Sequence, residues 1–274
     1  MEKRIEKLEE LSKSKTLRSC YEYSMTGIKH SGYFHIDPDG DKIGHEPFEV
    51  YCDFEDGSTQ IPHDHELATE ITPCPESMCF QLNLNYSVSM EQIVALKDIS
   101  ESCSQDIQFN CFLAPLTIND DPIGVWLNKD GQEETYFVGA NHGKHICTCG
   151  LSHNCSESEH DHICNCDAQL PVDQFDYGTI TNSTALPVTG FKYGNMEFSS
   201  QHASIEISRM KCKGTKKIEP EHLMDSCSNL KAAGAMSGNY VLNDGTVSFC
   251  DMTRQIYDPT IQRHIGKLRY NDVL

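Results

Sequence analysis

Two stretches of the sequence carry the same motif and decide the fold. The first reads Ser-Cys at 19–20, Gly27, Ser-Gly-Tyr at 31–33, Asp-Gly at 39–40 and Val-Tyr-Cys-Asp at 50–53, and it returns over 226–251 as Ser-Cys, Gly234, Ser-Gly-Asn-Tyr, Asp-Gly and Val-Ser-Phe-Cys-Asp. In both copies the glycine stands seven residues after the first cysteine and the tyrosine thirteen. This agreement predicts one complete module followed by the opening of a second. Two similar hairpins that agree by chance are the alternative.

Each copy of the motif predicts a short helix followed by a β-hairpin. About two turns of helix can run from Cys20 to Gly27, because glycine takes the left-handed conformation that closes a helix. An alternating strand over 33–36 then ends at the turn signal Asp-Pro-Asp-Gly, and a second strand over 48–52 returns beside it. A unit of this size is not stable alone, so it needs a further link.

Disulfides are expected to supply that link in both copies. The first and last cysteines of each motif are predicted to pair, Cys20 with Cys52 and Cys227 with Cys250. The chain has fourteen cysteines, an even number and far more than a cytosolic protein of 274 residues needs. Three Asn-x-Ser/Thr sites also indicate secretion and are candidates for glycosylation: Asn85, Asn154 and Asn182.

Composition limits the partners and the compartment. A formal charge of −19 argues against binding to nucleic acid and to anionic membranes, and it fits a basic partner or calcium. No cofactor is expected and no calcium site is assigned; an acidic surface without a specific role is the alternative. No run of eighteen apolar residues occurs, so no membrane span is expected in this chain. The cysteines favour an extracellular protein, either secreted or the ectodomain of a membrane protein, whose signal peptide is expected to lie outside this sequence.

Two further stretches of the sequence are predicted to be helical. Residues 1–18 are helix-prone, with a loose apolar stripe, but are too short to establish a coiled coil. They are either an oligomerisation segment of a homo-oligomer or a solvated lead-in. Ser89 to Gln92 has the form of a capping box, and the helix that it begins is expected to reach about Ser102 with an apolar face toward the core.

Several other stretches are predicted to be short strands. Residues 125–128 and 135–138 flank a turn signal and indicate a β-hairpin, in which Trp126 is expected to anchor the core. Strands also suit 186–193 and 203–207. Short antiparallel strands, few helices and many cysteines together predict a disulfide-rich α+β domain.

One stretch, 142–168, holds five cysteines and five histidines. Zinc prefers such ligands, but the cysteines form Cys-x-Cys pairs where structural zinc sites use Cys-x2-Cys. We therefore expect disulfides, with two bridges linking the pair 147/149 to the pair 164/166 and with Cys155 bonded to a cysteine elsewhere; zinc is the alternative. The disulfide candidates in this stretch are Cys147, Cys149, Cys155, Cys164 and Cys166.

The sequence offers no catalytic or metal site. It has no Gly-x-Ser-x-Gly, no His-Glu-x-x-His and no phosphate-binding glycine loop, and its thiols are expected to be bonded. The histidine pairs 63/65 and 160/162 could hold a transition metal weakly, but solvated loop histidines are the expectation. The chain is therefore predicted not to be an enzyme.

The order of the motifs resembles a known family. The relevant motifs are Ser-Gly-Tyr-x-x-Ile-Asp-Pro-Asp-Gly (31–40), Val-Tyr-Cys-Asp (50–53), Tyr-Ser-x-Ser-Met-Glu-Gln-Ile (86–93), Cys-Thr-Cys-Gly-Leu-x-x-Asn-Cys (147–155), Cys-Asn-Cys-Asp-Ala (164–168) and Leu-Pro-Val (186–188). Over residues 19–214 they are similar to the fibrinogen-like module of contactin-associated proteins, the neurexin-IV group. The resemblance implies a fibrinogen C-terminal-like domain in an extracellular adhesion protein, where the module sits among laminin-G and EGF-like repeats.

The resemblance, the internal repeat and the helix-prone N-terminus together set the expected domains. Residues 19–214 would form the fibrinogen-like domain, 1–18 an N-terminal helix and 215–274 a partial second opening module. Phe175 stands where the family usually has a tryptophan, and the calcium loop of true fibrinogen domains has no counterpart after Cys166.

Three functions remain open at this point. The first is a non-catalytic recognition or cell-adhesion module that binds an extracellular protein or glycan through surface loops such as 54–85 and 114–124. The second is a structural assembly domain of a secreted or matrix oligomer. The third is a lectin-like innate defence protein.

Overall fold

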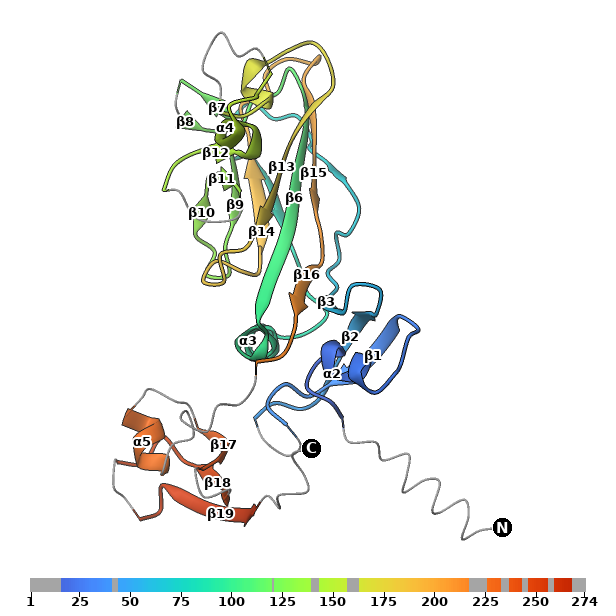
Figure 1. Cartoon of the computed structure of the whole chain (residues 1–274). Coiled ribbons are helices and arrows are strands. Elements are labelled where there is room, and N and C mark those ends of the chain that lie inside the picture. Colours follow the sequence, from blue (N-terminus) through green and yellow to red (C-terminus); the bar gives the residue numbers. More distant parts are fainter. Residues whose placement is uncertain are drawn as a thin grey trace.

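The first copy of the motif folds into a helix and three antiparallel strands. The structure is a computed structural model (Figure 1), and it describes residues 16–40, 44–119, 121–138, 143–156, 163–216, 226–232, 237–242, 246–255 and 259–267. The elements of this first copy, which we call the N-terminal module, are α2 (Cys20–Met25), β1 (Gly32–Ile36), β2 (Phe48–Asp53) and β3 (Ser58–Ile61). Ser19 caps α2 by accepting a hydrogen bond from the Glu22 amide, and Gly27 follows the helix with φ of +90°.

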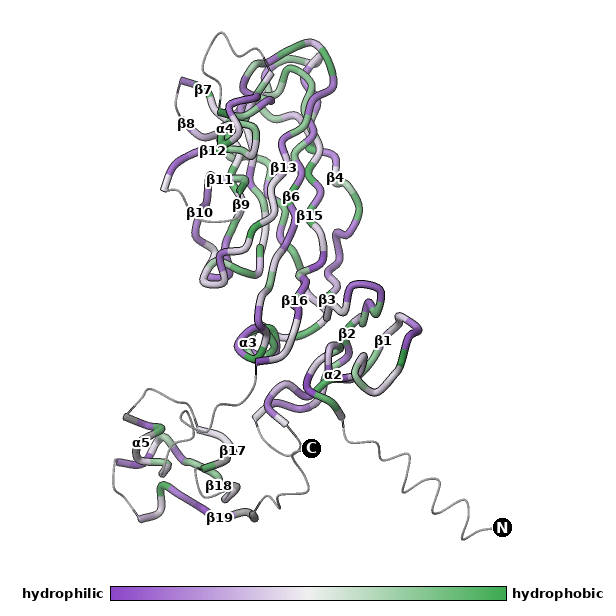
Figure 2. The backbone as a smooth tube through the Cα atoms, viewed as in Figure 1, coloured by the Kyte–Doolittle hydropathy of each residue, from purple (hydrophilic) through white to green (hydrophobic). Residues whose placement is uncertain are grey.

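The N-terminal module continues into one large antiparallel sheet. At its centre is β6 (Ser102–Phe112), which pairs with β13 (Gln174–Ile180) on one side. On the other side β6 pairs with β15 (His202–Ile207) and then with β16 (Met210–Lys213). Because β16 also pairs with β3, the order of the sheet is β1-β2-β3-β16-β6-β15-β4, with β4 being Thr69–Glu70. Every second residue of β6 is buried, and the hydropathy of that strand alternates accordingly (Figure 2).

A second, four-stranded sheet packs on the buried face of β6. Its order is β10 (Glu133–Glu134), β9 (Gly124–Leu127), β14 (Gly190–Tyr193) and β5 (Phe80–Asn83). The Phe109 ring of β6 lies 5.9 Å from the ring of Phe191 and 5.1 Å from that of Tyr193, both on β14. Trp126 is fully buried, as expected, and its indole donates a hydrogen bond to the Tyr136 carbonyl. The core therefore lies between two sheets.

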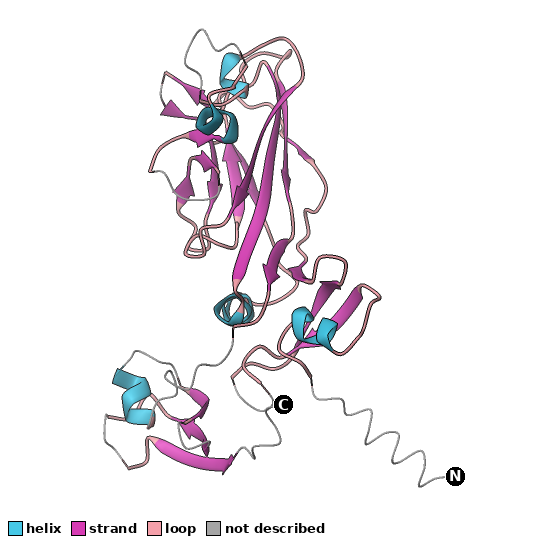
Figure 3. Ribbon diagram, viewed as in Figure 1, coloured by secondary structure: helices cyan, strands magenta, loops and turns pink. Residues whose placement is uncertain are grey.

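Helices are few and short (Figure 3). The predicted capping box is confirmed, since the Ser89 hydroxyl accepts from the Gln92 amide and the Gln92 side chain accepts from the Ser89 amide. The helix, α3, covers Met90–Ile99 and stops earlier than predicted because β6 begins at Ser102. The remaining small elements are β7 (Thr117–Ile118), β8 (Asp121–Pro122), β11 (Tyr136–Phe137), β12 (Ile146–Cys147), α4 (Thr148–Ser152) and η2 (Cys166–Ala168).

Two local predictions were wrong. Residues 135–138 do not complete a hairpin with 125–128: β9 pairs with β10, whereas β11 runs parallel to β12. The stretch 54–85 is not only loop, since it contains β3, β4 and β5, and all four residues of β3 are buried. In both cases long-range pairing decided the structure, which local periodicity does not reveal.

The second copy of the motif forms a similar unit, which we call the C-terminal module. Its elements are α5 (Cys227–Ala232), β17 (Gly238–Val241), β18 (Thr246–Cys250) and β19 (Gln262–Lys267) (Figure 1). Gly238 pairs with Cys250 as Gly32 pairs with Cys52. Its small separate core is built on Cys227, Cys250 and Ile261.

The third strand plays the same role in both modules. The Cys20 amide donates to the Thr59 hydroxyl on β3 at 3.0 Å, and the Cys227 amide donates to the Gln262 side chain on β19 at 3.4 Å. Thr59 and Gln262 stand opposite the second cysteine of their modules. The structural repeat thus extends to β19, beyond the repeated sequence.

The two ends of residues 19–215, which we call the main body, lie next to each other. The Ser19 hydroxyl lies 2.5 Å from the Thr215 hydroxyl, although 196 positions separate them in the sequence. Most of the helix predicted over 1–18 lies outside the described residues, and the boundaries 1–18, 19–214 and 215–274 stay predictions.

Candidate binding surface

All fourteen cysteines are bonded, and the structure contains the two disulfides predicted from the repeat. The bridges are Cys20–Cys52, Cys74–Cys79, Cys103–Cys212, Cys111–Cys166, Cys147–Cys164, Cys149–Cys155 and Cys227–Cys250. Seven disulfides are typical of an oxidising compartment.

The pairing predicted within the cysteine-rich stretch was wrong in part. Cys147 joins Cys164, but Cys149 does not join Cys166, and Cys155 does not bond outside the stretch. Cys149 lies within α4 and Cys155 follows the end of that helix, where the chain turns back so that their Cα atoms are 4.7 Å apart. Cys166 instead meets Cys111 on β6, a contact made by the long-range pairing of β6.

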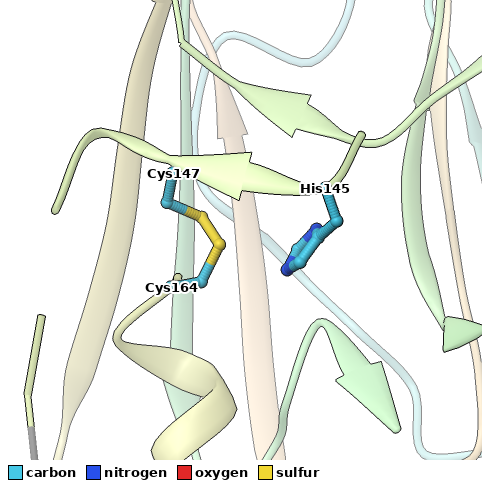
Figure 4. A group of neighbouring side chains, drawn as sticks. All are labelled: His145, Cys147 and Cys164. Carbon is cyan, nitrogen blue, oxygen red and sulfur yellow. A yellow bond between two sulfur atoms is a disulfide. The ribbon is translucent and has the colours of Figure 1, made fainter. Parts of the chain in front are cut away.

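His145, Cys147 and Cys164 lie close together but do not form a metal site (Figure 4). The two sulfurs are bonded to each other, so neither is a thiolate ligand. His145 Nδ1 lies 3.0 Å from the Thr135 carbonyl oxygen, and its Nε2 lies 2.9 Å from an Asp167 carboxylate oxygen. Both ring nitrogens are therefore occupied within the protein.

Two buried carboxylates tie this stretch to the sheets. Asp167 accepts hydrogen bonds from the amides of Leu116 and Thr117, and Asp176 on β13 accepts from those of Asn165 and Cys166. Burial raises the pKa of the Asp176 carboxyl to about 6. Burial opposes a charge on His145, but its bond to Asp167 outweighs this and raises the pKa of the imidazole. These groups are structural, because their partners are protein atoms.

His63 likewise has a structural role. Its Nε2 lies within hydrogen-bond distance of the carbonyl oxygens of Ile207 and Ser208, and its Nδ1 accepts from the His65 amide. Burial lowers the pKa of the His63 imidazole. The pair His160 and His162 lies outside the described residues.

A group of aromatic and charged side chains, one exposed and three half-buried, lies where the N-terminal module joins the large sheet. Tyr33 on β1 and Tyr51 on β2 are cross-strand partners, with ring centroids 5.4 Å apart in an edge-to-face arrangement. The Arg209 guanidinium carbon lies 5.1 Å from the centroid of the Tyr51 ring. We call Tyr33, Tyr51, Arg209 and Glu66 the tyrosine–arginine cluster.

An ion pair holds this cluster in one conformation. Arg209 donates two hydrogen bonds to the carboxylate oxygens of Glu66, at 2.7 and 2.6 Å, and these bonds lower the pKa of Glu66. Tyr33 is 55% exposed, and Leu67, which follows Glu66 in the sequence, is 83% exposed. Tyrosine and arginine dominate the binding energy of protein interfaces, and a prearranged cluster loses little side-chain entropy on binding.

The C-terminal module keeps only part of this arrangement. Phe249 takes the place of Tyr51 in the strand register, and the Arg263 guanidinium lies 5.4 Å from the centroid of its ring. The position of Tyr33 is filled by Asn239. The cross-strand pair of tyrosines, one exposed and one half-buried, thus occurs in the N-terminal module and not at the equivalent positions of the C-terminal module.

The three candidate glycosylation sites differ in their surroundings. Asn85 and Asn154 are exposed, and Asn182 is half-buried. The Asn85 side-chain amide donates to Asp64 at 2.6 Å, and that of Asn182 donates to the Tyr136 hydroxyl at 3.4 Å. Whether they carry glycans stays a prediction.

The sequence did not identify the tyrosine–arginine cluster. Tyr33 and Tyr51 occupy outward positions of predicted strands, which was the one available signal. Arg209 and Glu66 are 143 positions apart, and no local pattern links them to each other.

The comparisons with known proteins find relatives for most of this chain. The chain is similar to contactin-associated protein 1 of Rattus norvegicus and of Homo sapiens, with 33% identity over 201 residues in each case, and to that of Mus musculus with 32%. The match covers 72% of this chain but only 14% of the relatives' length. No protein-family model matches. Among the described residues, no helix has the length and apolar character needed to cross a bilayer. This chain therefore contains a region homologous to part of contactin-associated protein 1.

Proposed function

We propose that this chain is a non-catalytic extracellular recognition module with a fibrinogen-like fold, which acts in cell adhesion by binding a protein partner through the tyrosine–arginine cluster. The observation that carries the proposal is the homology to contactin-associated protein 1, whose name states an association with contactin. The seven disulfides support the extracellular compartment.

The cluster has the chemistry of a protein contact. Tyr33 offers a large ring at a low entropy loss, while the Glu66 carboxylate already neutralises Arg209, so binding does not bury an unpaired charge. Disulfides on two sides, Cys20–Cys52 and Cys103–Cys212, fix the strands that carry the cluster. A rigid surface of this kind favours recognition over catalysis, and no cysteine is free to act as a nucleophile.

A binding measurement on the full chain tests the proposal. Immobilised contactin and cells that display it are the first partners to use. The double variant Tyr33→Ala, Arg209→Ala is expected to weaken binding by more than tenfold, as the loss of interface anchors does. Tyr21→Ala, at a 40% exposed tyrosine on α2, is the matched control and should bind as the wild type does. Equal binding of the double variant and the control would refute this surface.

One observation favours a second candidate, a structural assembly domain. In the N-terminal module the outer edge of β3 pairs with β16, but among the described residues no strand pairs with the outer edge of β19. An open edge of this kind can accept a strand from another molecule. Sedimentation velocity of the full chain and of a chain lacking residues 1–18 discriminates between the candidates, because a monomer in both cases contradicts assembly.

A further inference from the structure

An open groove lies beside the Cys149–Cys155 bridge, away from the tyrosine–arginine cluster. It has a volume of about 290 Å³. Two aromatic residues of β13 line it, Phe175 with 55% and Tyr177 with 40% of its surface exposed. Exposed aromatic rings that share one groove need an explanation, because water solvates them poorly. In the described structure no protein side chain covers them.

The groove also contains a candidate glycosylation site. Asn154 lines it and begins the acceptor triplet Asn154-Cys155-Ser156. The Ser156 hydroxyl accepts a hydrogen bond from Gln174 at 2.6 Å, and the Asn165 side chain accepts from the Ser156 amide while it donates to the Phe175 carbonyl at 3.0 Å. These bonds hold the acceptor triplet against the strand that carries the exposed rings.

We infer that Asn154 carries an N-linked glycan whose first sugar lies in this groove against Phe175 and Tyr177. The apolar C–H face of a pyranose suits an aromatic ring, and its hydroxyls suit the hydroxyl and amide groups of Thr148, Ser152 and Asn165 that line the same groove. The glycan would thus cover surface that the protein leaves exposed.

The chemistry is that of asparagine-linked transfer in the secretory pathway. A lipid-pyrophosphate-linked oligosaccharide is the donor. A bond forms between Nδ2 of Asn154 and the anomeric carbon, the bond between that carbon and the pyrophosphate oxygen breaks, Nδ2 loses one proton, and the lipid pyrophosphate leaves. The inference rests on the proposed function only in requiring an extracellular protein.

The structure separates Asn154 from the other two acceptors. The Asn85 amide is bound to Asp64, and Asn182 is half-buried beside Tyr136. Asn154 is exposed and shares a groove with exposed aromatic rings. Glycans at Asn85 or Asn182 would extend into solvent without such a contact.

The experiment has two stages, both on the full chain secreted from animal cells. Peptide mapping after amidase deglycosylation in H2¹⁸O first measures the occupancy of each acceptor, and we expect Asn154 to be glycosylated. Thermal unfolding then follows in an Asn85→Gln, Asn182→Gln background. Loss of the whole glycan, by enzyme or in Asn154→Gln, should lower Tm by about 3 °C, the shift expected from one aromatic contact in a domain of this size. Trimming to a single N-acetylglucosamine should leave Tm unchanged.

Two variants locate the contact. In Phe175→Ala, removal of the glycan should change Tm by about half as much as in the wild type or less, because the more exposed of the two rings that the sugar covers is gone. Phe198→Ala is the matched control, since Phe198 is 66% exposed and does not line the groove; it should keep the full shift. An unoccupied Asn154, or an equal shift in the two variants, overturns the inference. An unoccupied Asn154 with glycan at another acceptor refutes this site alone, whereas free thiols and no glycan at any acceptor would also refute the proposed extracellular role.

Discussion

The N-terminal and C-terminal modules are one local structure in two environments. Each has a short helix, a disulfide from the helix to the second strand, and a third strand that binds the first amide of the helix. In the first, β3 is fully buried between β2 and β16. In the second, the described side chains of β19, from Gln262 to His264, are exposed. The same motif therefore specifies the unit, while its stability depends on what covers the third strand.

The largest contrast should appear when the disulfides are removed. Cys227→Ser, Cys250→Ser is expected to unfold the C-terminal module, because a bridge over 23 residues contributes roughly 3 kcal/mol and the core holds little else. Hydrogen exchange over 226–267 should lose all slow amides. In Cys20→Ser, Cys52→Ser the strands β1 to β3 should keep slow amides, because β16 still pairs with β3. Slow exchange retained after loss of Cys227–Cys250 would contradict the comparison.

A smaller contrast concerns the third strand. Thr59→Val keeps the shape of a buried side chain but removes the acceptor of the Cys20 amide, so the free energy of unfolding should fall by about 1–3 kcal/mol. Gln262→Leu removes the equivalent acceptor from an exposed residue, and the change should stay within about 0.5 kcal/mol. Urea unfolding of the full chain measures both. A similar loss in the two variants would show that burial of the third strand is not the difference.

The pH dependence of stability should differ between the main body, which contains His145, and the C-terminal module. His145 has a raised pKa in the folded state, so its stabilising contribution is complete below its unfolded pKa of about 6.5 and is lost as pH rises through the folded value. The Tm of the main transition should therefore fall between pH 6 and 8, and His145→Gln should reduce that dependence. A steeper dependence in the variant would exclude this assignment.

The smallest contrast involves the two arginines that lie over aromatic rings. Arg209→Ala removes both the contact with Tyr51 and the ion pair with Glu66, and it should destabilise the protein by about 1 kcal/mol. Arg263→Ala should cost about 0.5 kcal/mol or less, because among the described residues the Arg263 guanidinium has the contact with the Phe249 ring and no ion pair. Differential scanning calorimetry can compare them, with Glu66→Gln as the variant that keeps the cation over Tyr51. A larger effect of Arg263→Ala would reverse the predicted order.

Local signals in the sequence predicted the features that depend on neighbouring residues. The helix start at Ser89, the burial of Trp126 and the Cys20–Cys52 bridge each follow from short-range patterns. The fibrinogen-like assignment remains part of the proposal, because the structure establishes only a mostly β, disulfide-rich fold.

Features that depend on distant residues were not predicted. The bridge from Cys111 to Cys166 requires knowing that β6 passes beside the cysteine-rich stretch. The third strand β19 shares no sequence motif with β3. The repeat found in the sequence therefore did not include β19, although the structural repeat does. The tyrosine–arginine cluster joins β1, β2 and the segment before β16 through contacts that exist only once the sheet has formed.

The contact between Ser19 and Thr215 has a mechanical consequence. A polypeptide that enters and leaves a folded body at one place transmits tension between those two points without loading the sheets beyond them. In a longer chain that contains the main body, the body would lie beside the line of the chain, and its residues would add almost nothing to the end-to-end length of that chain. When such a chain is under tension between two surfaces, the main body would stay folded. The pulling force would not change the arrangement of Tyr33 and Tyr51 within it.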